Sequence, residues 1–198
     1  MNRIAFEFRR KTIHIIFGLA IVILLYFNLL NAVLLGVLVV VGIILSLIEK
    51  DKRLPVLSKL LDLFEREDAR KRMPGEGLIF YLAGALVSVI LFPKDVAMAS
   101  ITVLAIGDAV SHLAGIGIGK IKHPFNDRKF LEGWLAGVVA AFIACLFFIG
   151  IEEAFVGTIA GMLIEVFDIV VMNRRVNDNF LIPPFAGLAI IALRILKR

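Results

Sequence analysis

The sequence of 198 residues contains one cysteine, Cys145, and no glutamine. A single cysteine excludes an internal disulfide framework and leaves the redox compartment open. Scarcity of glutamine and cysteine is typical of thermophilic proteins. Charged residues make up only 20% of the chain, whereas hydrophobic residues make up 60%. Soluble domains are closer to half apolar, so this composition excludes an ordinary soluble domain and indicates a membrane protein.

The first residues are basic, as the start of a secretory signal would be. No small-residue cleavage site follows them, and apolar sequence simply continues, so we expect no removable signal peptide. The length suits one domain, and we predict a single integral-membrane domain over residues 1–198. A formal net charge of +5 would suggest nucleic acid for a soluble protein. In a membrane protein the topology explains this charge, so no nucleic-acid partner is expected.

Seven apolar stretches approach the ~17–25 residues that a membrane-spanning helix needs. They cover residues 12–27, 32–48, 77–92, 96–115, 131–149, 154–172 and 180–196. Asn28 and Asn31 frame a tight turn after the first stretch, which predicts an antiparallel hairpin of the first two helices. The predicted fold class is therefore an all-α polytopic membrane protein with about seven transmembrane helices.

Lysine and arginine are distributed unevenly between the loops. Eighteen of them precede the first apolar stretch or lie in alternate loops after it, whereas the other loops hold only Lys94. Cytoplasmic loops of membrane proteins carry the excess of Lys and Arg, so the N-terminus and the basic loops are predicted to be cytoplasmic. The tail, with Arg194, Lys197 and Arg198, disagrees, because seven spans would place it outside. Either the last stretch is re-entrant or a basic tail is tolerated there.

The longest of these loops, residues 50–75, contains an amphipathic stretch. Its apolar residues share one face of a helix, and its charged residues lie on the others. The apolar face consists of Leu57, Leu60, Leu61 and Phe64. This pattern predicts one amphipathic helix lying on the cytoplasmic leaflet, ended by Pro74 and Gly75.

Asp108 lies inside the fourth apolar stretch. A rise of 1.5 Å per residue from Val96 places it ~18 Å into a ~30 Å hydrocarbon slab, toward the cytoplasmic side. Ionisable residues at such depths are costly, and they usually mark functional sites. The alternative is a structural aspartate that is hydrogen-bonded to Ser111 or His112. We favour the functional interpretation.

A glycine-rich stretch with lysines follows Asp108. Gly115, Gly117 and Gly119 precede Lys120, and Lys129 comes soon after. Backbone N–H groups at glycines, with lysines beside them, suit phosphate oxygens. Close packing of two helices is the other explanation for glycines spaced in this way. The stretch is not a Walker A motif, because no Ser or Thr follows the lysine.

Four carboxylates are predicted to converge on one cytoplasmic cleft. They are Asp108, Glu132, Glu165 and Asp178. Glu132 opens the fifth apolar stretch, where favourable interaction with the helix dipole is the alternative role. Oxygen ligands without a cluster of Cys or His favour Mg²⁺, which commonly binds through one or two carboxylates plus substrate phosphates.

Taken in order, these motifs resemble the CTP-dependent lipid-alcohol kinases, the family of dolichol, phytol and yeast-type diacylglycerol kinases. The opening motif is Arg10-Lys11-x-x-His14, residues that would otherwise be interpreted as interfacial anchors. The central block comprises Gly107-Asp108-Ala109, the glycines with Lys120, and Lys129-x-x-Glu132-Gly133. The last motif is Glu165 with Asn177-Asp178-Asn179 and then Ile182-Pro183. Asn126-Asp127-Arg128 stands where the family usually has Ser-Pro, and the chain is shorter than the eukaryotic dolichol kinases.

The resemblance implies transfer of the γ-phosphate of CTP to a membrane isoprenoid alcohol, dolichol or another polyprenol. It implies Mg²⁺ held by Asp108, Glu132 and Asp178, and Glu165 or Asp178 as the acceptor of the alcohol proton. The phosphate-binding residues that it implies are Arg10, Lys11, His14, Gly107, Gly117, Gly119, Lys120, Lys129, Gly133, Asn177 and Asn179. The partners are then CTP, the lipid alcohol and the bilayer, with the active site on the cytoplasmic side.

Other functions stay open at this point. Diacylglycerol, phytol or geranylgeraniol could replace the polyprenol as the acceptor. A cytidylyltransferase that acts on a lipid phosphate has a similar central block, but its C-terminal block, an Asp-Arg pair in a glycine-rich run, is missing here. A transporter is the non-enzymatic alternative, in which Asp108 and Asp178 would form an ion path.

Overall fold

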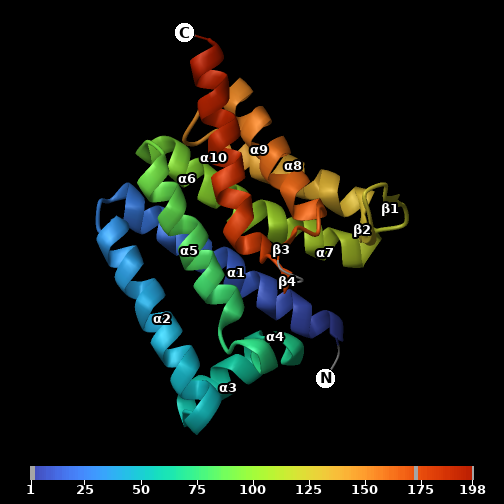
Figure 1. Ribbon diagram of the computed structural model, residues 1–198. Helices are drawn as coiled ribbons and strands as arrows, with labels where there is room; N and C mark the ends of the chain where they lie inside the picture. Colours follow the sequence, from blue (N-terminus) through green and yellow to red (C-terminus); the bar gives the residue numbers. More distant parts are fainter. Residues whose placement is uncertain (1–2, 172–173, 198) are drawn as a thin grey trace.

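The computed structural model describes residues 3–171 and 174–197, and helices dominate it (Figure 1). The first half contains α1 (Arg3–Tyr26), α2 (Ala32–Lys52), α3 (Pro55–Phe64), α4 (Glu67–Arg72) and α5 (Glu76–Leu91). A continuous rod follows, made of α6 (Lys94–Thr102), the π-helix η1 (Val103–Asp108) and α7 (Ala109–Ile118). The remainder contains β1 (Lys122–His123), β2 (Asn126–Phe130), α8 (Leu131–Cys145), α9 (Ile151–Val166), β3 (Val170–Val171), β4 (Arg174–Arg175) and α10 (Asp178–Leu196).

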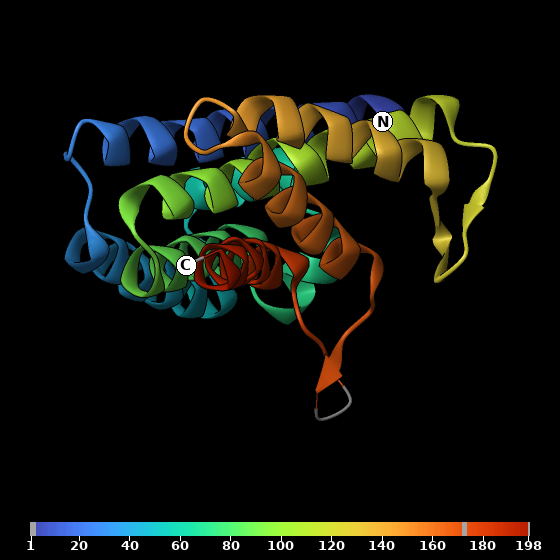
Figure 2. The ribbon, with the colours of Figure 1, turned by 90° about the horizontal axis from the view of Figure 1, so that it is seen from above.

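Each of the seven apolar stretches lies largely on a helix, which confirms the prediction of a helical fold. Three helical segments are long and apolar enough to cross a membrane: Ala32–Lys52, Lys94–Ile118 and Asp178–Leu196. The helices Glu76–Leu91 and Leu131–Cys145 are apolar but shorter. The sequence did not predict the two antiparallel hairpins, β1–β2 and β3–β4, which project from the helical body (Figure 2).

The sixth apolar stretch was predicted to stay helical to residue 172, but α9 ends at Val166. Two side chains from β2 bind the last carbonyl groups of the helix. Asn126 Nδ2 donates to the Val166 carbonyl at 2.8 Å, and Lys129 Nζ donates to that of Glu165. Helix ends need such partners for their unpaired carbonyls, so β2 fixes where α9 stops. Residue 172 itself lies outside the described residues.

The turn between α1 and α2 is confirmed, but the predicted antiparallel hairpin of these helices is not formed. Asn28 adopts a positive φ of 57°, and the Asn31 side chain caps α2 by accepting from the Leu34 backbone N–H at 3.0 Å. From this turn α1 and α2 diverge, and α2 packs against α5 instead (Figure 1). The two helices therefore belong to different sides of the molecule, with α1, α7 and α8 on one side and α2, α5 and α10 on the other (Figure 2).

Glycines bring α8 very close to the rod. A Cβ added at Gly133 would lie 2.8 Å from the Gly115 Cα, and one at Gly137 would lie 2.6 Å from the Gly107 carbonyl oxygen. Small residues permit this approach of two backbones, which is how helices associate in an apolar environment. The packing explanation of these glycines therefore holds in the structure.

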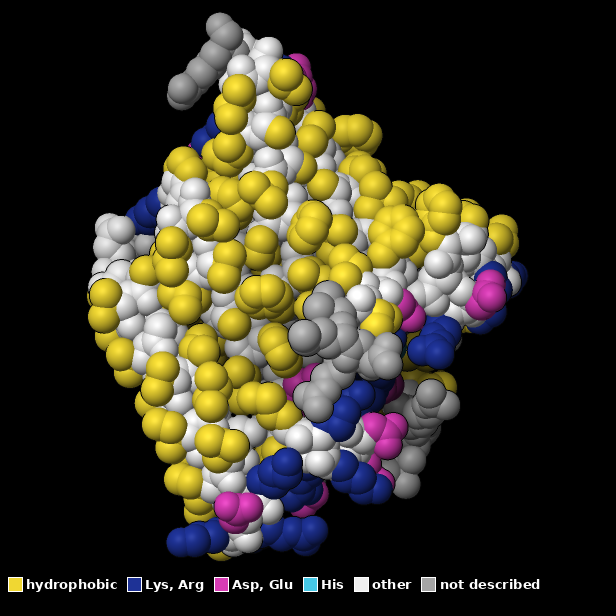
Figure 3. All heavy atoms as spheres, in the orientation of Figure 1, with side chains coloured by type: hydrophobic (Ala, Val, Ile, Leu, Met, Phe, Trp, Pro, Cys, Tyr) yellow, Lys and Arg dark blue, Asp and Glu magenta, His cyan; other side chains and the backbone are white. Residues whose placement is uncertain are grey.

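The surface of the molecule is strongly apolar. Figure 3 shows hydrophobic side chains over most of one face, with charged side chains gathered around α3, α4 and the β1–β2 hairpin. Val33 on α2 is 75% exposed, and Leu196 on α10 is 83% exposed. Apolar patches of this extent mark contact with a membrane or with another protein.

The basic C-terminal end is neutralised by acidic residues. Arg194 pairs with Asp95 at 2.6 Å and with Glu153 at 2.8 Å, and Lys197 pairs with Glu152. These partners belong to the first turns of α6 and α9, so the C-terminus lies beside those turns and far from the N-terminus (Figure 1). The excess of positive charge that disagreed with the loop pattern is therefore balanced locally.

The longest basic loop forms α3 and α4, and Pro74-Gly75 ends it with Gly75 at φ 78°. The predicted amphipathic helix is α3, in which no residue is buried. Its contacts are polar: Arg9 Nε donates to the Leu63 carbonyl at 3.0 Å, and Ser58 Oγ donates to Glu49. It is therefore held at the edge of the bundle rather than packed within it.

Candidate functional site: a buried ionic cluster

The π-helix η1 positions the first carboxylate of the site. π-helical turns are rare, and they occur frequently at functional sites. This one ends at Asp108, whose exposure is only 4%. Within the same turn, the Leu104 carbonyl oxygen lies 3.1 Å from His14 Nε2. The wider turn thus presents a carboxylate and a carbonyl oxygen to α1.

Two residues of α1 bind Asp108. Lys11 Nζ forms an ion pair with Asp108 Oδ2, and His14 Nε2 lies 3.3 Å from the same oxygen. Because this Nε2 faces two acceptors, the carboxylate and the Leu104 carbonyl, it must carry a hydrogen. Tyr81 packs edge-on against the His14 ring, with ring centroids 4.7 Å apart. These contacts fix both α1 side chains against the rod.

A second ion pair lies beside the first. Lys129 on β2 pairs with Glu165 on α9, and Ser111 Oγ donates to Glu165 Oε2 at 3.1 Å. Ser111 follows Asp108 by three residues, so both side chains lie on one face of the rod. Lys129 is close enough to Asp108 for their charges to interact. The two ion pairs therefore form one connected set.

Asp178, in the first turn of α10, is near enough to Lys11 and Glu165 for its charge to reach both, and it is partly buried. We define the buried ionic cluster by seven residues, of which the last two lie at its partly buried edge: Lys11, His14, Asp108, Ser111, Glu165, Lys129 and Asp178. The sequence had singled out all of them except Ser111 as site residues, from motifs spread over most of the chain. The fold brings them to one place.

The charges of the buried ionic cluster do not balance. Its three carboxylates exceed its two lysines by one negative charge when His14 is neutral. Among the residues that the structure describes, no group of three or more His, Cys, Asp or Glu side chains could hold a metal ion unaided. Mg²⁺ commonly uses one or two carboxylates and completes its shell with water and substrate phosphates. The excess carboxylate charge fits that mode of binding.

Other predicted site residues lie elsewhere or have structural partners. Gly117 is part of α7 with open space beside it, and Gly119 packs against Phe130. Glu132 accepts from the backbone N–H groups of Lys120 and Ile121, at 3.2 and 3.1 Å. The glycine stretch is therefore mostly helical in the structure, and Glu132 binds the turn that follows it.

The two asparagines around Asp178 shape the start of α10. The Asn177 side chain caps the helix by accepting from the Asn179 backbone N–H at 3.1 Å. Asn179 Nδ2 donates to the Gly77 carbonyl at 2.9 Å and so joins α10 to α5. Both residues therefore position Asp178, whatever else they bind.

One carboxylate next to the cluster was missed from the sequence. Glu7 is 5% exposed, and it binds Arg10, Arg66 and His112 at 2.8 to 2.9 Å. Arg10, predicted to bind phosphate, thus contacts Glu7 here. The available signal was the spacing of Glu7 and Lys11, which lie one helical turn apart on the same face of α1.

The charge on Glu7 gives a pH-dependent contribution to stability. Burial alone would raise the pKa of Glu7, but the hydrogen bond from His112 and the charges of Arg10 and Arg66 outweigh it and hold the pKa well below its ordinary value of 4.5. A lowered pKa contributes stability above the unfolded-state pKa, and this is lost as the pH falls through the folded-state value. We therefore expect the thermal midpoint of unfolding to decrease as the pH is lowered below 4.5, and to decrease less steeply in the Glu7→Gln variant than in wild type. Equal slopes for both proteins would contradict this assignment.

The fold and the buried ionic cluster define a class: an apolar helical protein, with helices suited to a membrane, that encloses paired charges. The chain is 33% identical over 179 residues to the uncharacterized protein MJ1137 of Methanocaldococcus jannaschii, covering 89% of this chain and 88% of that protein. It therefore belongs to the same family as MJ1137. It is also 31% identical over 113 residues to the uncharacterized protein RP860 of Rickettsia prowazekii, covering 54% of this chain and 53% of that one. No protein-family model and no solved structure matches the chain.

Proposed function

We propose that this protein is an integral-membrane kinase that transfers the γ-phosphate of CTP to an isoprenoid alcohol such as dolichol or another polyprenol. One observation carries the proposal. Motifs that resemble those of the lipid-alcohol kinases, far apart in the sequence, supply a single buried ionic cluster within an apolar helical bundle. Phosphoryl transfer depends mainly on positioning and charge neutralisation, and a preorganised set of carboxylates and lysines serves both.

In this proposal all seven apolar stretches cross the membrane. The end of the bundle that carries the N-terminus, α3 and α4 is cytoplasmic, because it holds most of the basic residues. The opposite end, where Arg194 binds Asp95 and Glu153, lies outside. The amphipathic helix α3 then rests on the cytoplasmic leaflet. CTP reaches the buried ionic cluster from the cytoplasm, while the lipid tail stays in the bilayer.

Asp108 and Asp178 are the proposed ligands of Mg²⁺, and the metal would neutralise charge on the nucleotide phosphates. Glu132 is left out of this set, because its carboxylate is engaged by the turn after α7. Lys11 and Lys129 face the same cluster, and as point cations they would stabilise the phosphoryl oxygens. His14, fixed by the Leu104 carbonyl, directs Nε2–H toward the place where Asp108 and a phosphate would meet.

The chemical step is an in-line displacement. The alcohol oxygen forms a bond to the γ-phosphorus, the bond from that phosphorus to the bridging oxygen breaks, and CDP leaves with the electron pair. The alcohol proton passes to a carboxylate. Asp178 is better placed than Glu165 for this role, since Glu165 is 3% exposed and is already bound by Lys129 and Ser111. In this proposal Asp178 would both help to hold Mg²⁺ and accept the alcohol proton, because a carboxylate has two oxygens.

Radiolabelled CTP tests the proposal directly. We expect purified protein in proteoliposomes, supplied with Mg²⁺ and a polyprenol, to move label from the γ-position of CTP into the lipid. Label from the α-position appearing in the lipid would instead show a cytidylyltransferase. Ion flux without any transfer would favour a transporter. Diacylglycerol and phytol, offered in parallel, identify the acceptor. The scarcity of glutamine and cysteine, typical of thermophilic proteins, favours the polyprenol.

A further inference from the structure

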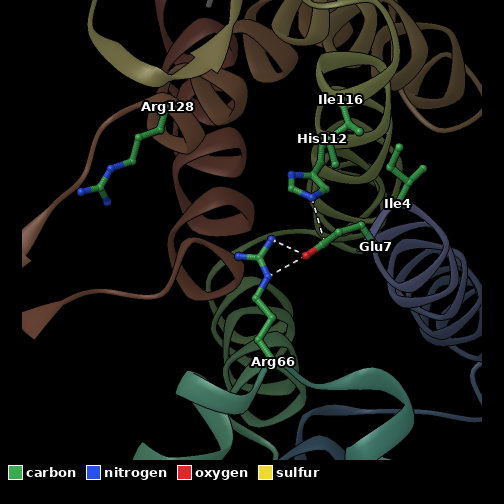
Figure 4. Close-up of a pocket in the computed structure, with 6 residues that line it drawn as sticks. All are labelled: Ile4, Glu7, Arg66, His112, Ile116 and Arg128. Atoms are coloured by element: carbon green, nitrogen blue, oxygen red, sulfur yellow. Dashed lines mark hydrogen bonds and ion pairs between the residues drawn. The ribbon is translucent and has the colours of Figure 1, made fainter. Parts of the chain in front are cut away.

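A pocket of about 350 Å³ opens where the start of α1 meets α7, the β1–β2 hairpin and the α3–α4 turn. Its lining combines apolar and charged side chains: Ile4, Glu7, Arg66, His112, Ile116 and Arg128. Figure 4 shows Arg66 and His112 directed at Glu7, while Arg128 stands across the pocket with its guanidinium turned away. No step of the proposed reaction uses this pocket.

Two guanidinium groups share one carboxylate beside this pocket. Arg66 donates to Glu7 Oε1 through Nε and Nη2, both at 2.8 Å. Arg10 and His112 contact Oε2, through Nη2 and Nε2, both at 2.9 Å. Two arginines against a single negative charge leave a net positive charge, and Arg66 is half exposed, with 52% of its side chain accessible. Charge-assisted hydrogen bonds of this kind are also the ones that arginine makes to phosphate oxygens.

The pocket adjoins the buried ionic cluster along two helices. Glu7 precedes Lys11 by four residues on α1, and His112 follows Asp108 by four residues on the rod. Four residues of helix correspond to about 6 Å and to the same face. The Glu7–His112 contact thus lies one turn from the Lys11–Asp108 contact, on its outer side. A polyphosphate that reaches Asp108 from the polar end of the bundle passes this pocket.

We propose that this pocket is the outer part of a polyphosphate site, and that Glu7 holds its arginines until the nucleotide arrives. Arg66 then exchanges the Glu7 carboxylate for a phosphate oxygen, and His112 and Arg128 line the opening. The Arg66 guanidinium is paired with an anion before and after this exchange, so no step leaves its charge without a partner. This inference extends the proposed function, but it concerns binding and can be tested without turnover.

Two substitutions with opposite expected signs test it. Pyrophosphate and CTP are titrated, with Mg²⁺, into the full-length protein in detergent. Arg66→Ala is expected to weaken binding of both roughly tenfold, the loss of a charged hydrogen-bond pair. Glu7→Gln is expected to tighten binding a few-fold, because it releases Arg10 and Arg66. If the Glu7–Arg66 pair is only structural, both substitutions weaken binding alike, and that result overturns the inference.

Arg72→Ala is the matched control, since Arg72 lies on α4 in the same basic loop and contacts Glu76 at 3.3 Å. The Arg72→Ala variant should bind pyrophosphate and CTP with unchanged affinity. The affinity of the Arg66→Lys variant should lie between those of wild type and Arg66→Ala. If CTP binds with the same affinity to wild type, Arg66→Ala and Glu7→Gln, the inference about the pocket is wrong and the kinase proposal is unaffected. Arg66-dependent binding without any phosphoryl transfer supports the pocket and refutes the kinase. No binding of either anion refutes both.

Discussion

Replacement of Asp108 by asparagine is expected to reduce the rate of lipid phosphorylation by about 10²–10³-fold, the range for loss of one preorganised electrostatic group in an active site. The substitution also leaves Lys11 charged and buried without its partner. Removal of one member of a buried ion pair destabilises a protein by about 3–5 kcal/mol. Turnover of labelled CTP and thermal unfolding, measured on the same preparation, record the two effects.

The two effects separate in a double variant. Lys11→Met combined with Asp108→Asn removes both charges, so it should recover much of the lost stability while turnover stays low. Asp168→Asn is the control, because Asp168 also forms an ion pair, with Arg175, but lies outside the buried ionic cluster. Full turnover by the Asp108→Asn protein would refute the site assignment even if wild type phosphorylates lipid.

The second large effect is expected at the contact between the rod and α8. Gly137→Leu places a side chain where a Cβ alone would lie 2.6 Å from the Gly107 carbonyl oxygen and 2.8 Å from Met162 Cε. Overpacking of this kind typically costs about 1–3 kcal/mol, and here one of the atoms in the way, the Gly107 carbonyl oxygen, belongs to the backbone. A Cβ at this position would also lie 2.7 Å from the Ser111 Cβ, so the new side chain should displace Ser111, which binds Glu165. We therefore expect a lower thermal midpoint together with lost activity.

Gly36→Ala provides the control for this substitution. Gly36 is also helical, on α2, and a Cβ there meets nothing within 4 Å. Alanine is the better helix former, so this change should stabilise the protein by about 0.5–1 kcal/mol. If Gly137→Leu and Gly36→Ala shift the thermal midpoint equally, close packing between the rod and α8 is not a main support of the fold.

The sequence predicted the helices and most of the buried ionic cluster for different reasons. Apolar runs of sufficient length specify helices directly, and each of the seven lies largely on helix. The carboxylates Asp108, Glu165 and Asp178 were predicted because such residues stand out against an apolar background. Lys11 and His14 were predicted only from the resemblance to the lipid-alcohol kinases. Which residues pair with one another could not be predicted from the sequence. Lys11 and Asp108 are 97 residues apart, and the packing of α1 against the rod brings them together.

The glycines show where local sequence reasoning stops. Gly115 and Gly119 have the composition of a phosphate-binding turn and also that of a helix contact, and the residues themselves do not differ between the two. The structure shows the helix contact: Gly115 packs against Gly133 and Phe130, and Gly119 against Phe130. Glu7 was missed for a related reason. An acidic residue near the start of a helix is common, and its pairing with Arg66 from a distant segment is visible only in the folded structure.

The π-helix has a consequence for the register of the rod. Each residue of an α-helix turns the chain by about 100°, so an additional residue in a regular α-helix would rotate everything that follows by that angle. A π-helical turn is wider and accommodates the additional residue within the turn. The segment before Val103 is buried on all sides from Val96 to Thr102, and the segment after Asp108 directs Ser111 at Glu165 and His112 at Glu7. A plain α-helix that lacks one residue between 103 and 107 would keep both alignments, because the deletion removes the same ~100° that the wider turn absorbs. It would lose the wide turn that presents Asp108 and the Leu104 carbonyl oxygen to α1. The π-turn thus adds one residue to the rod, at the site, without rotating the segments on either side of it.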